Sequence, residues 1–147
     1  MTEIRKIGEN DIEAIASLES EIFSDTWSEK SIKETYENRN ACILGAYKEG
    51  VLAGYVIFYY VLDEGEIARI AVSPQYRRQG VADQIFAGLL DFCAEKSIER
   101  ILLDVRTSNE PAIAFYRKSG FAEDGIRKNF YENPKEDALL MSVSVVR

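Results

Sequence analysis

Residues 76–86, YRRQGVADQIF, place two adjacent arginines, a glutamine and a glycine directly before the first turn of an expected helix. The segment before them, EIARIAV at residues 66–72, is rich in β-branched and apolar residues and is typical of a strand. The segment after them, residues 81–96, repeats apolar side chains at helical spacing. This order of strand, basic turn and helix decides the local fold, and it raises the question of which anion the turn holds.

A helix that begins at such a turn offers an anion both backbone and side-chain donors. The first N–H groups of a helix have no intrahelical partner, and they carry a partial positive charge. Gly80 permits a close backbone approach or a positive φ, and Arg77, Arg78 and Gln79 add donors. Phosphate-binding patterns of the types G-x-x-x-x-G-K-[S/T] and G-x-G-x-x-G do not occur. The remaining pattern, R-x-x-G-x-A, fits an anion site or a solvated turn with a capping glycine.

The rest of the chain predicts one mixed α/β (α+β) domain spanning residues 1–147. Strands are expected at residues 4–7, 41–48, 51–62, 66–72, 100–106, around 130–131, and at 138–146. Helices are expected at residues 11–23, from 28 onward, at 81–96 and at 110–121. This order favours a mixed central sheet of about seven strands flanked by about four helices.

Two local signals refine this outline. Ser28 is expected to cap the second helix, which should carry Ile32 and Tyr36 inward. Glu49-Gly50 predicts a hairpin, and residues 63–65 predict the next turn.

Composition narrows the class of partner. A net charge of −7 argues against duplex nucleic acid, which would require a basic face, and suits a basic substrate. No apolar run reaches the roughly 20 residues that span a bilayer, and MTEIRKIGEND lacks the apolar core of a signal peptide. We therefore expect a cytoplasmic protein that does not bind membranes. Cys42 and Cys93 are expected to be buried thiols, and no metal site is expected, because no CxxC and no histidine occurs.

The absence of histidine also limits the chemistry. Serine–histidine and cysteine–histidine mechanisms lack their base, so acid–base work falls to Asp, Glu, Tyr, Cys or Lys.

A second motif gives the basic turn a family context. After the next strand comes N-x-x-A-x-x-F-Y-x-x-x-G-F, formed by Asn109, Ala112, Phe115, Tyr116, Gly120 and Phe121. Together with R-x-x-G-x-A, this layout resembles the GNAT acetyltransferases along essentially the whole chain. The segments WSEKSI, VLDE, IAVSPQYRRQG, VRTSN and IRKNFYENPKEDALLM are similar to the RimI-type members. Those enzymes acetylate the N-terminal alanine of the eighteenth protein of the small ribosomal subunit.

The resemblance implies acetyl-coenzyme A (acetyl-CoA) as cosubstrate, with its pyrophosphate wrapped by backbone N–H groups of the basic turn. It also implies that the backbone of a strand binds the pantetheine arm and that Asn109 lies in the pantetheine region. Asp83 departs from the family, where a basic residue is common, and an outward-pointing side chain would avoid conflict with phosphate. The coenzyme-binding residues implied in this way are Ile70, Ala71, Val72, Arg77, Arg78, Gln79, Gly80, Val81, Ala82, Asp83 and Asn109.

The resemblance also assigns a base and an acid. Asp104 occupies the base position, where the RimI-type enzymes carry glutamate, and aspartate is shorter by about 1.5 Å. A water relay is therefore expected, although Asp104 could instead make only structural bonds. An N-terminal amine, with a pKa of about 8, is an undemanding acceptor for such a base. Tyr116 matches the family's proton donor to the coenzyme A thiolate.

Three alternatives remain at this point. The acceptor could be a lysine side chain, a polyamine or an aminoglycoside, and only the WSEK and C-terminal motifs argue against that. The domain could bind acyl-coenzyme A without catalysis, which the tyrosine at position 116 argues against. A nucleotide-binding domain would require a phosphate loop that does not occur.

Overall fold

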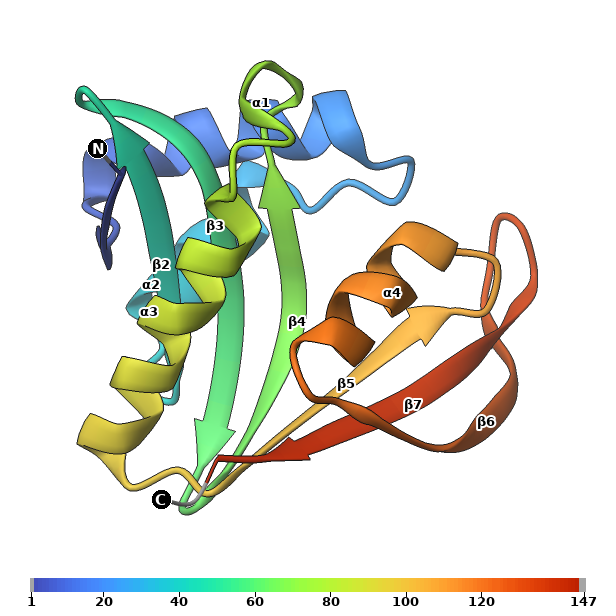
Figure 1. The fold of residues 1–147 in the computed structure, drawn as a ribbon. Coiled ribbons are helices and arrows are strands. Elements are labelled where there is room, and N and C mark those ends of the chain that lie inside the picture. The colour runs from blue at the N-terminus through green and yellow to red at the C-terminus, as the bar shows by residue number, and fades with distance from the viewer. Residues whose placement is uncertain (1, 146–147) are drawn as a thin grey trace.

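The computed structural model describes residues 2–145 as one seven-stranded sheet with two helices on each face (Figure 1). The strand order across the sheet is β1-β2-β3-β4-β5-β7-β6. The strands are β1 (Thr2–Lys6), β2 (Ala41–Lys48), β3 (Val51–Val61), β4 (Glu64–Val72), β5 (Arg100–Arg106), β6 (Ala122–Tyr131) and β7 (Glu136–Ser144). The α-helices are α1 (Ile12–Ile22), α2 (Glu29–Glu37), α3 (Val81–Lys96) and α4 (Glu110–Lys118). This is the mixed sheet that the sequence predicts.

The sheet divides where β4 meets β5. These two strands are parallel, whereas the other neighbouring pairs in residues 2–145 are antiparallel. Their register covers only residues 64–66 of β4 and 100–102 of β5. Figure 1 shows the two strands diverging beyond that point. The backbone of the later part of β4 is therefore not paired with β5, and a ligand could bind along it.

The two faces of the sheet carry separate apolar cores. One core joins α1 and α2 to the sheet through residues such as Ile15, Ile32 and Ile57. The other joins α3 and α4 through residues such as Ile85 and Leu89. Successive strand residues point to opposite faces, so β2, β3 and β4 contribute to both cores. In β5, residues 101, 103 and 105 pack toward α3 and α4, which turns residues 102, 104 and 106 toward the α1/α2 face.

Most of the predicted elements are confirmed, with shifts at their ends. α3 and β5 begin and end where the periodicity predicted. Ser28 caps α2 by accepting a hydrogen bond from the Ser31 N–H at 3.1 Å. The hairpin at residues 49–50 is also present, and the next turn lies at residues 62–63 rather than 63–65. Cys42 and Cys93 are buried and free, as predicted.

Three expectations need correction or a limit. Tyr36 is 38% exposed and does not point inward, because Ile32 and Thr35, three residues apart, form the buried face of α2. β6 is ten residues long, much longer than the strand expected around 130–131. The last strand was expected to reach residue 146, which lies outside the described residues. Within residues 2–145, no helix is long and apolar enough to cross a membrane.

Gly54 permits close packing of β3 against the part of β4 that is not paired with β5. A Cβ on Gly54 would lie 2.6 Å from the Ala71 carbonyl oxygen and 3.1 Å from Ile85 Cδ1. We expect Gly54→Ala to lower the free energy of unfolding by about 1–3 kcal/mol, because the backbone of β4 cannot yield as a flexible side chain would. Chemical denaturation would measure this change. Gly125→Ala is the matched control, because a Cβ there meets nothing within 4 Å, and equal stability of the two variants would contradict the prediction.

Candidate functional site

The basic turn begins α3 in the conformation that its glycine allows. Gly80 is the residue before the helix and has φ 78° and ψ 13°, in the left-handed region. Arg78 also has a positive φ of 63°. The positive φ angles at residues 78 and 80 turn the chain sharply before α3, whose first N–H groups have no intrahelical partner. The prediction that Gly80 supplies a positive φ is therefore confirmed.

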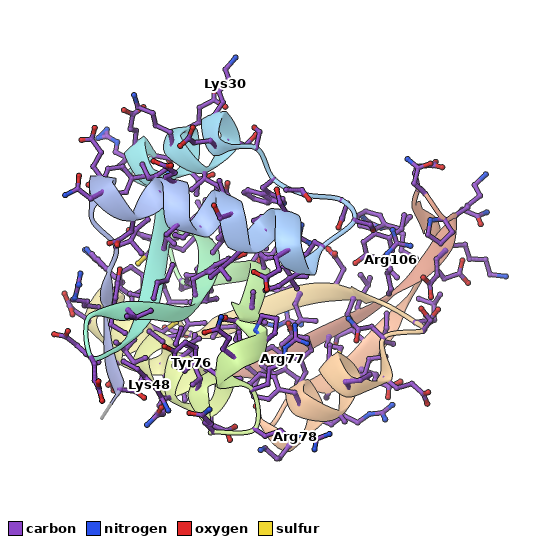
Figure 2. All side chains as sticks on the ribbon, turned by 90° about the horizontal axis from the view of Figure 1, so that it is seen from above. Lys30, Lys48, Tyr76, Arg77, Arg78 and Arg106 are labelled. Carbon is purple, nitrogen blue, oxygen red and sulfur yellow. The ribbon has the colours of Figure 1, made fainter. Side chains whose placement is uncertain are left out.

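The side chains of the basic turn contact two different strands, β4 and β2. The Arg77 guanidinium donates to the Val72 carbonyl at 3.4 Å. Gln79 accepts from Lys48 Nζ at 2.7 Å, and this lysine comes from the far end of β2. Figure 2 shows Lys48 on one side of the turn and Arg78 on the other. Lys48 is a basic residue at this turn that sequence reasoning missed, because the contact joins residues 31 positions apart.

Asp83 is partly exposed, and its carboxylate pairs with Lys118. The Lys118 Nζ to Asp83 Oδ2 distance is 3.2 Å, and the pair joins the first turn of α3 to the end of α4. The side chain of Asp83 is 53% exposed. Lys118 therefore partly offsets the negative charge of Asp83, which lies close to the predicted phosphate site.

Asn109 has a structural role that the motif alone did not show. It is the residue before α4, and its side-chain oxygen accepts a hydrogen bond from the Ala112 N–H at 3.3 Å. This cap occupies the oxygen but leaves the two N–H donors of the side-chain amide for another partner. Its assignment to the coenzyme remains a prediction.

Asp104 lies on the α1/α2 face of β5, where the Tyr131 hydroxyl donates to its Oδ1 at 2.9 Å. The Arg106 guanidinium lies over the Tyr131 ring at 4.5 Å. Burial, then the charge of Asp104 and the hydrogen bond to it, raise the pKa of Tyr131 well above its usual value. Tyr131 therefore remains a hydrogen-bond donor to Asp104 at neutral pH. Sequence reasoning missed this partner, although residue 131 falls within the quoted C-terminal motif.

A second carboxylate that sequence reasoning missed lies beside Asp104. Glu66 on β4 is in register with Leu102, which points to the same face of β5 as Asp104. Burial raises the pKa of Glu66, the charge of Asp104 raises it further, and Arg127 opposes both. No motif marked Glu66, because its position depends on how β4 and β5 pair.

Tyr116 lies on the other face of the sheet. It lies in the core formed with α3 and α4, is 7% exposed, and packs edge-on against Phe121 at 5.5 Å. Burial first, and the charge of Asp104 second, raise the pKa of Tyr116 well above its usual value. Asp104, two residues beyond the last residue of β5 that pairs with β4, and Tyr116 thus lie on opposite faces of the sheet.

The remaining residues predicted to bind the coenzyme lie on β4 and at the start of α3. Ile70, Ala71 and Val72 lie on the part of β4 that is not paired with β5. Val81 and Ala82 form the first turn of α3, directly after Gly80. Among residues 2–145, no group of three or more Cys, Asp or Glu side chains is arranged to hold a metal ion.

Comparison with known proteins gives consistent similarities. Residues 12–121 match the model of the acetyltransferase (GNAT) family. The chain is 32% identical over 147 residues to the ribosomal protein bS18-alanine N-acetyltransferase of Escherichia coli K12, covering 99% of both chains. A Bacillus subtilis protein that carries this name provisionally is 38% identical over 143 residues, covering 97% of this chain and 95% of its own.

Solved structures agree with the sequence comparisons. The crystal structure of the ribosomal-protein-S18-alanine N-acetyltransferase from Escherichia coli has a TM-score of 0.92 and 31% identity, covering 100% of this chain and 96% of that one. The fold is also that of Arabidopsis thaliana NAA60 in complex with acetyl-CoA, at a TM-score of 0.89 and 17% identity, covering 98% of each chain.

Proposed function

This chain belongs to the GNAT acetyltransferase family, and from that premise we propose that it acetylates the N-terminal alanine of ribosomal protein bS18 with acetyl-CoA. The observation that carries the proposal is that Asp104 and Tyr116 lie on opposite faces of the sheet, with Asp104 just beyond the point where β4 and β5 separate. The near full-length similarity to bS18-alanine N-acetyltransferases supports the choice of substrate. A ribosomal-protein substrate fits a cytoplasmic reaction carried out by residues 1–147 as one domain.

The coenzyme would bind on the face that carries α3 and α4. The N–H groups at the start of α3 would hold its pyrophosphate, assisted by Arg77, Arg78 and Gln79. At residues 70–72 one edge of β4 pairs with β3 and the other edge is not paired with β5, and this second edge would hydrogen-bond the pantetheine arm like an added strand. One of these N–H groups would polarise the thioester carbonyl. Acetyl-CoA supplies the acetyl group and the thiolate leaving group.

The acceptor would approach from the α1/α2 face, where Asp104 lies. Asp104, through a water molecule, takes the proton of the α-ammonium group, and the neutral nitrogen attacks the thioester carbon. The C–N bond forms, the C–S bond breaks, and the thiolate receives a proton from Tyr116. The second proton of the attacking nitrogen passes to solvent, and solvent reprotonates Tyr116. The base and the acid thus act from opposite faces without competing for one position.

The direct test is mass spectrometry of ribosomal proteins incubated with the enzyme and acetyl-CoA. We expect one acetyl group on the N-terminal alanine of bS18. Acetylation of a lysine side chain or of a polyamine in a panel of amines, without modification of bS18, would overturn the choice of substrate.

Replacing Asp104 by asparagine should slow the reaction most where the acceptor amine is protonated. We expect kcat/KM of Asp104→Asn to fall by about 10²- to 10⁴-fold at pH 7 and by less at about pH 9. An α-amine with a pKa of about 8 is mostly neutral at the higher pH, so it needs the base less. The measurement is a pH–rate profile on an alanine-starting bS18 peptide.

The controls separate this effect from other causes. Asp91→Asn removes an exposed carboxylate from α3 and should behave like the wild type. A blocked peptide with an acetylated N-terminus and a free lysine should not react. Equal rates for Asp104→Asn and the wild type at every pH would show that Asp104 is not the base. Its role would then be limited to the hydrogen bond with Tyr131.

A further inference from the structure

A buried carboxylate on α1 is fully satisfied by groups from three other segments. Glu19 has an exposed fraction of 0%. Its carboxylate accepts hydrogen bonds from the Trp27 N–H at 3.0 Å and from the Tyr55 hydroxyl at 2.5 Å. The Arg69 guanidinium adds two more, from Nε at 3.1 Å and from Nη2 at 3.0 Å. An ionised group without water is stable only with such a complete set of partners.

Arg69 connects this buried group to the loop between α1 and α2. Its Nη2 donates to the Asp25 carbonyl at 2.8 Å and lies 3.5 Å from Asp25 Oδ1. Its guanidinium also lies 3.7 Å from the centre of the Phe23 ring. One side chain of β4 therefore contacts the loop at both ends of the short segment 23–25. This strand position directly precedes residues 70–72, which are assigned to the coenzyme.

The loop carries a largely exposed carboxylate on the same face of the sheet as Asp104. The side chain of Asp25 is 58% exposed, whereas that of Arg69 is 13% exposed. The charge of Asp25 acts on Tyr131, whose pKa is raised mainly by burial and by Asp104 and also by Asp25, while Arg106 opposes these effects. Asp25, held by Arg69 of β4, and the hydrogen-bonded pair Tyr131–Asp104 therefore lie on the same face of the sheet, the face covered by α1 and α2.

The buried ion pair is better suited to fixing geometry than to adding stability. Replacing a buried pair by apolar side chains of similar volume is often neutral or stabilising, because desolvation of both charges offsets their attraction. The pair Glu19–Arg69 instead fixes where the loop lies, since four directional hydrogen bonds hold the carboxylate.

We propose that Asp25 binds the α-ammonium group of the incoming acceptor. Arg69 and Glu19 are then positioning residues, which hold the loop that carries Asp25 in place. The proposal rests on the proposed function. Near pH 7 about nine tenths of an α-amine is protonated, so the acceptor arrives as a cation. An exposed carboxylate on the loop that Arg69 holds over the face of the sheet carrying Asp104 attracts that cation, and Asp104 then removes its proton.

The test compares steady-state kinetics of variants on an alanine-starting bS18 peptide. Asp25→Asn should raise the KM for the peptide by about tenfold to a hundredfold, with kcat changed by less than about threefold. Asp25→Glu should recover most of the lost affinity. The Kd for acetyl-CoA, measured by calorimetry, should be unchanged in both variants. Glu21→Gln is the matched control, because it removes an exposed carboxylate from α1 with the same change in net charge.

A double-mutant cycle tests the positioning role. Arg69→Lys keeps the charge but loses the two-pronged contact, and it should raise the KM for the peptide in a folded protein. Asp25→Asn should then add little in the Arg69→Lys background, because the loop is already displaced. Independent, additive effects would overturn the positioning role of Arg69.

Three outcomes separate this inference from the proposed function. A wild type that acts on the peptide, with an unchanged KM in folded Asp25→Asn, would overturn the role of Asp25 alone. A lower kcat with an unchanged KM would overturn it as well. A wild type without activity on the peptide would overturn the proposed function itself.

Discussion

Replacing Tyr116 by phenylalanine is expected to lower kcat by about 10²- to 10⁴-fold, the usual contribution of a positioned proton donor. The ring should remain in place, because Phe121 and the core around α4 hold it through apolar contacts. Only the hydroxyl is lost, so the Kd for acetyl-CoA should change by less than about twofold. Single-turnover kinetics would measure the chemical step, and calorimetry would measure coenzyme binding.

The raised pKa of Tyr116 gives this prediction a pH dependence. Burial and the charge of Asp104 favour the neutral phenol, so Tyr116 keeps its proton through pH 10, the ordinary pKa of tyrosine. The wild-type rate should therefore show no loss from ionisation of Tyr116 between pH 7 and 10. The same preference for the neutral phenol contributes to the free energy of unfolding. This contribution is fully present below pH 10 and is lost as the pH rises further.

The control for this variant is Tyr36→Phe, which removes a hydroxyl from an exposed tyrosine on α2. It should keep the wild-type rate. Wild-type turnover by Tyr116→Phe, with the chemical step shown to be rate-limiting, would leave Tyr116 only its packing role.

Replacing Gly80 by glutamate is expected to raise the Kd for coenzyme A by at least about a hundredfold. A carboxylate at the start of α3 would occupy the position proposed for the pyrophosphate and repel its charge. A Cβ on Gly80 meets nothing within 4 Å, so the protein should fold, with a loss of about 1 kcal/mol from the positive φ. Calorimetry would measure the affinity, and thermal unfolding would confirm the fold.

Gly50 offers a matched control for this substitution. It also has a positive φ, of 81°, with nothing within 4 Å of a Cβ, but it lies in the hairpin between β2 and β3. Gly50→Glu should cost similar stability and leave coenzyme affinity unchanged. Similar Kd values for folded Gly80→Glu and Gly50→Glu would contradict a pyrophosphate site at the basic turn.

The sequence alone determined the parts of the fold that depend on neighbouring residues. α3 follows from an apolar repeat, the start of α2 from the capping serine at position 28, and the first hairpin from Glu49-Gly50. The left-handed conformation of Gly80 follows in the same way from a glycine directly before a helix. These signals are read correctly because the interactions that produce them span only a few residues.

Only the tertiary structure decided the features that depend on distant contacts. β6 is exposed along nearly its whole length, so no apolar alternation marks it, and pairing with β7 defines it instead. The bond between Tyr131 and Asp104 joins residues 27 positions apart, and the one between Arg69 and Glu19 joins residues 50 apart. Such pairs depend on which face each strand presents and on where β4 and β5 separate. A local pattern carries no information on either, because both are set by how the whole sheet pairs.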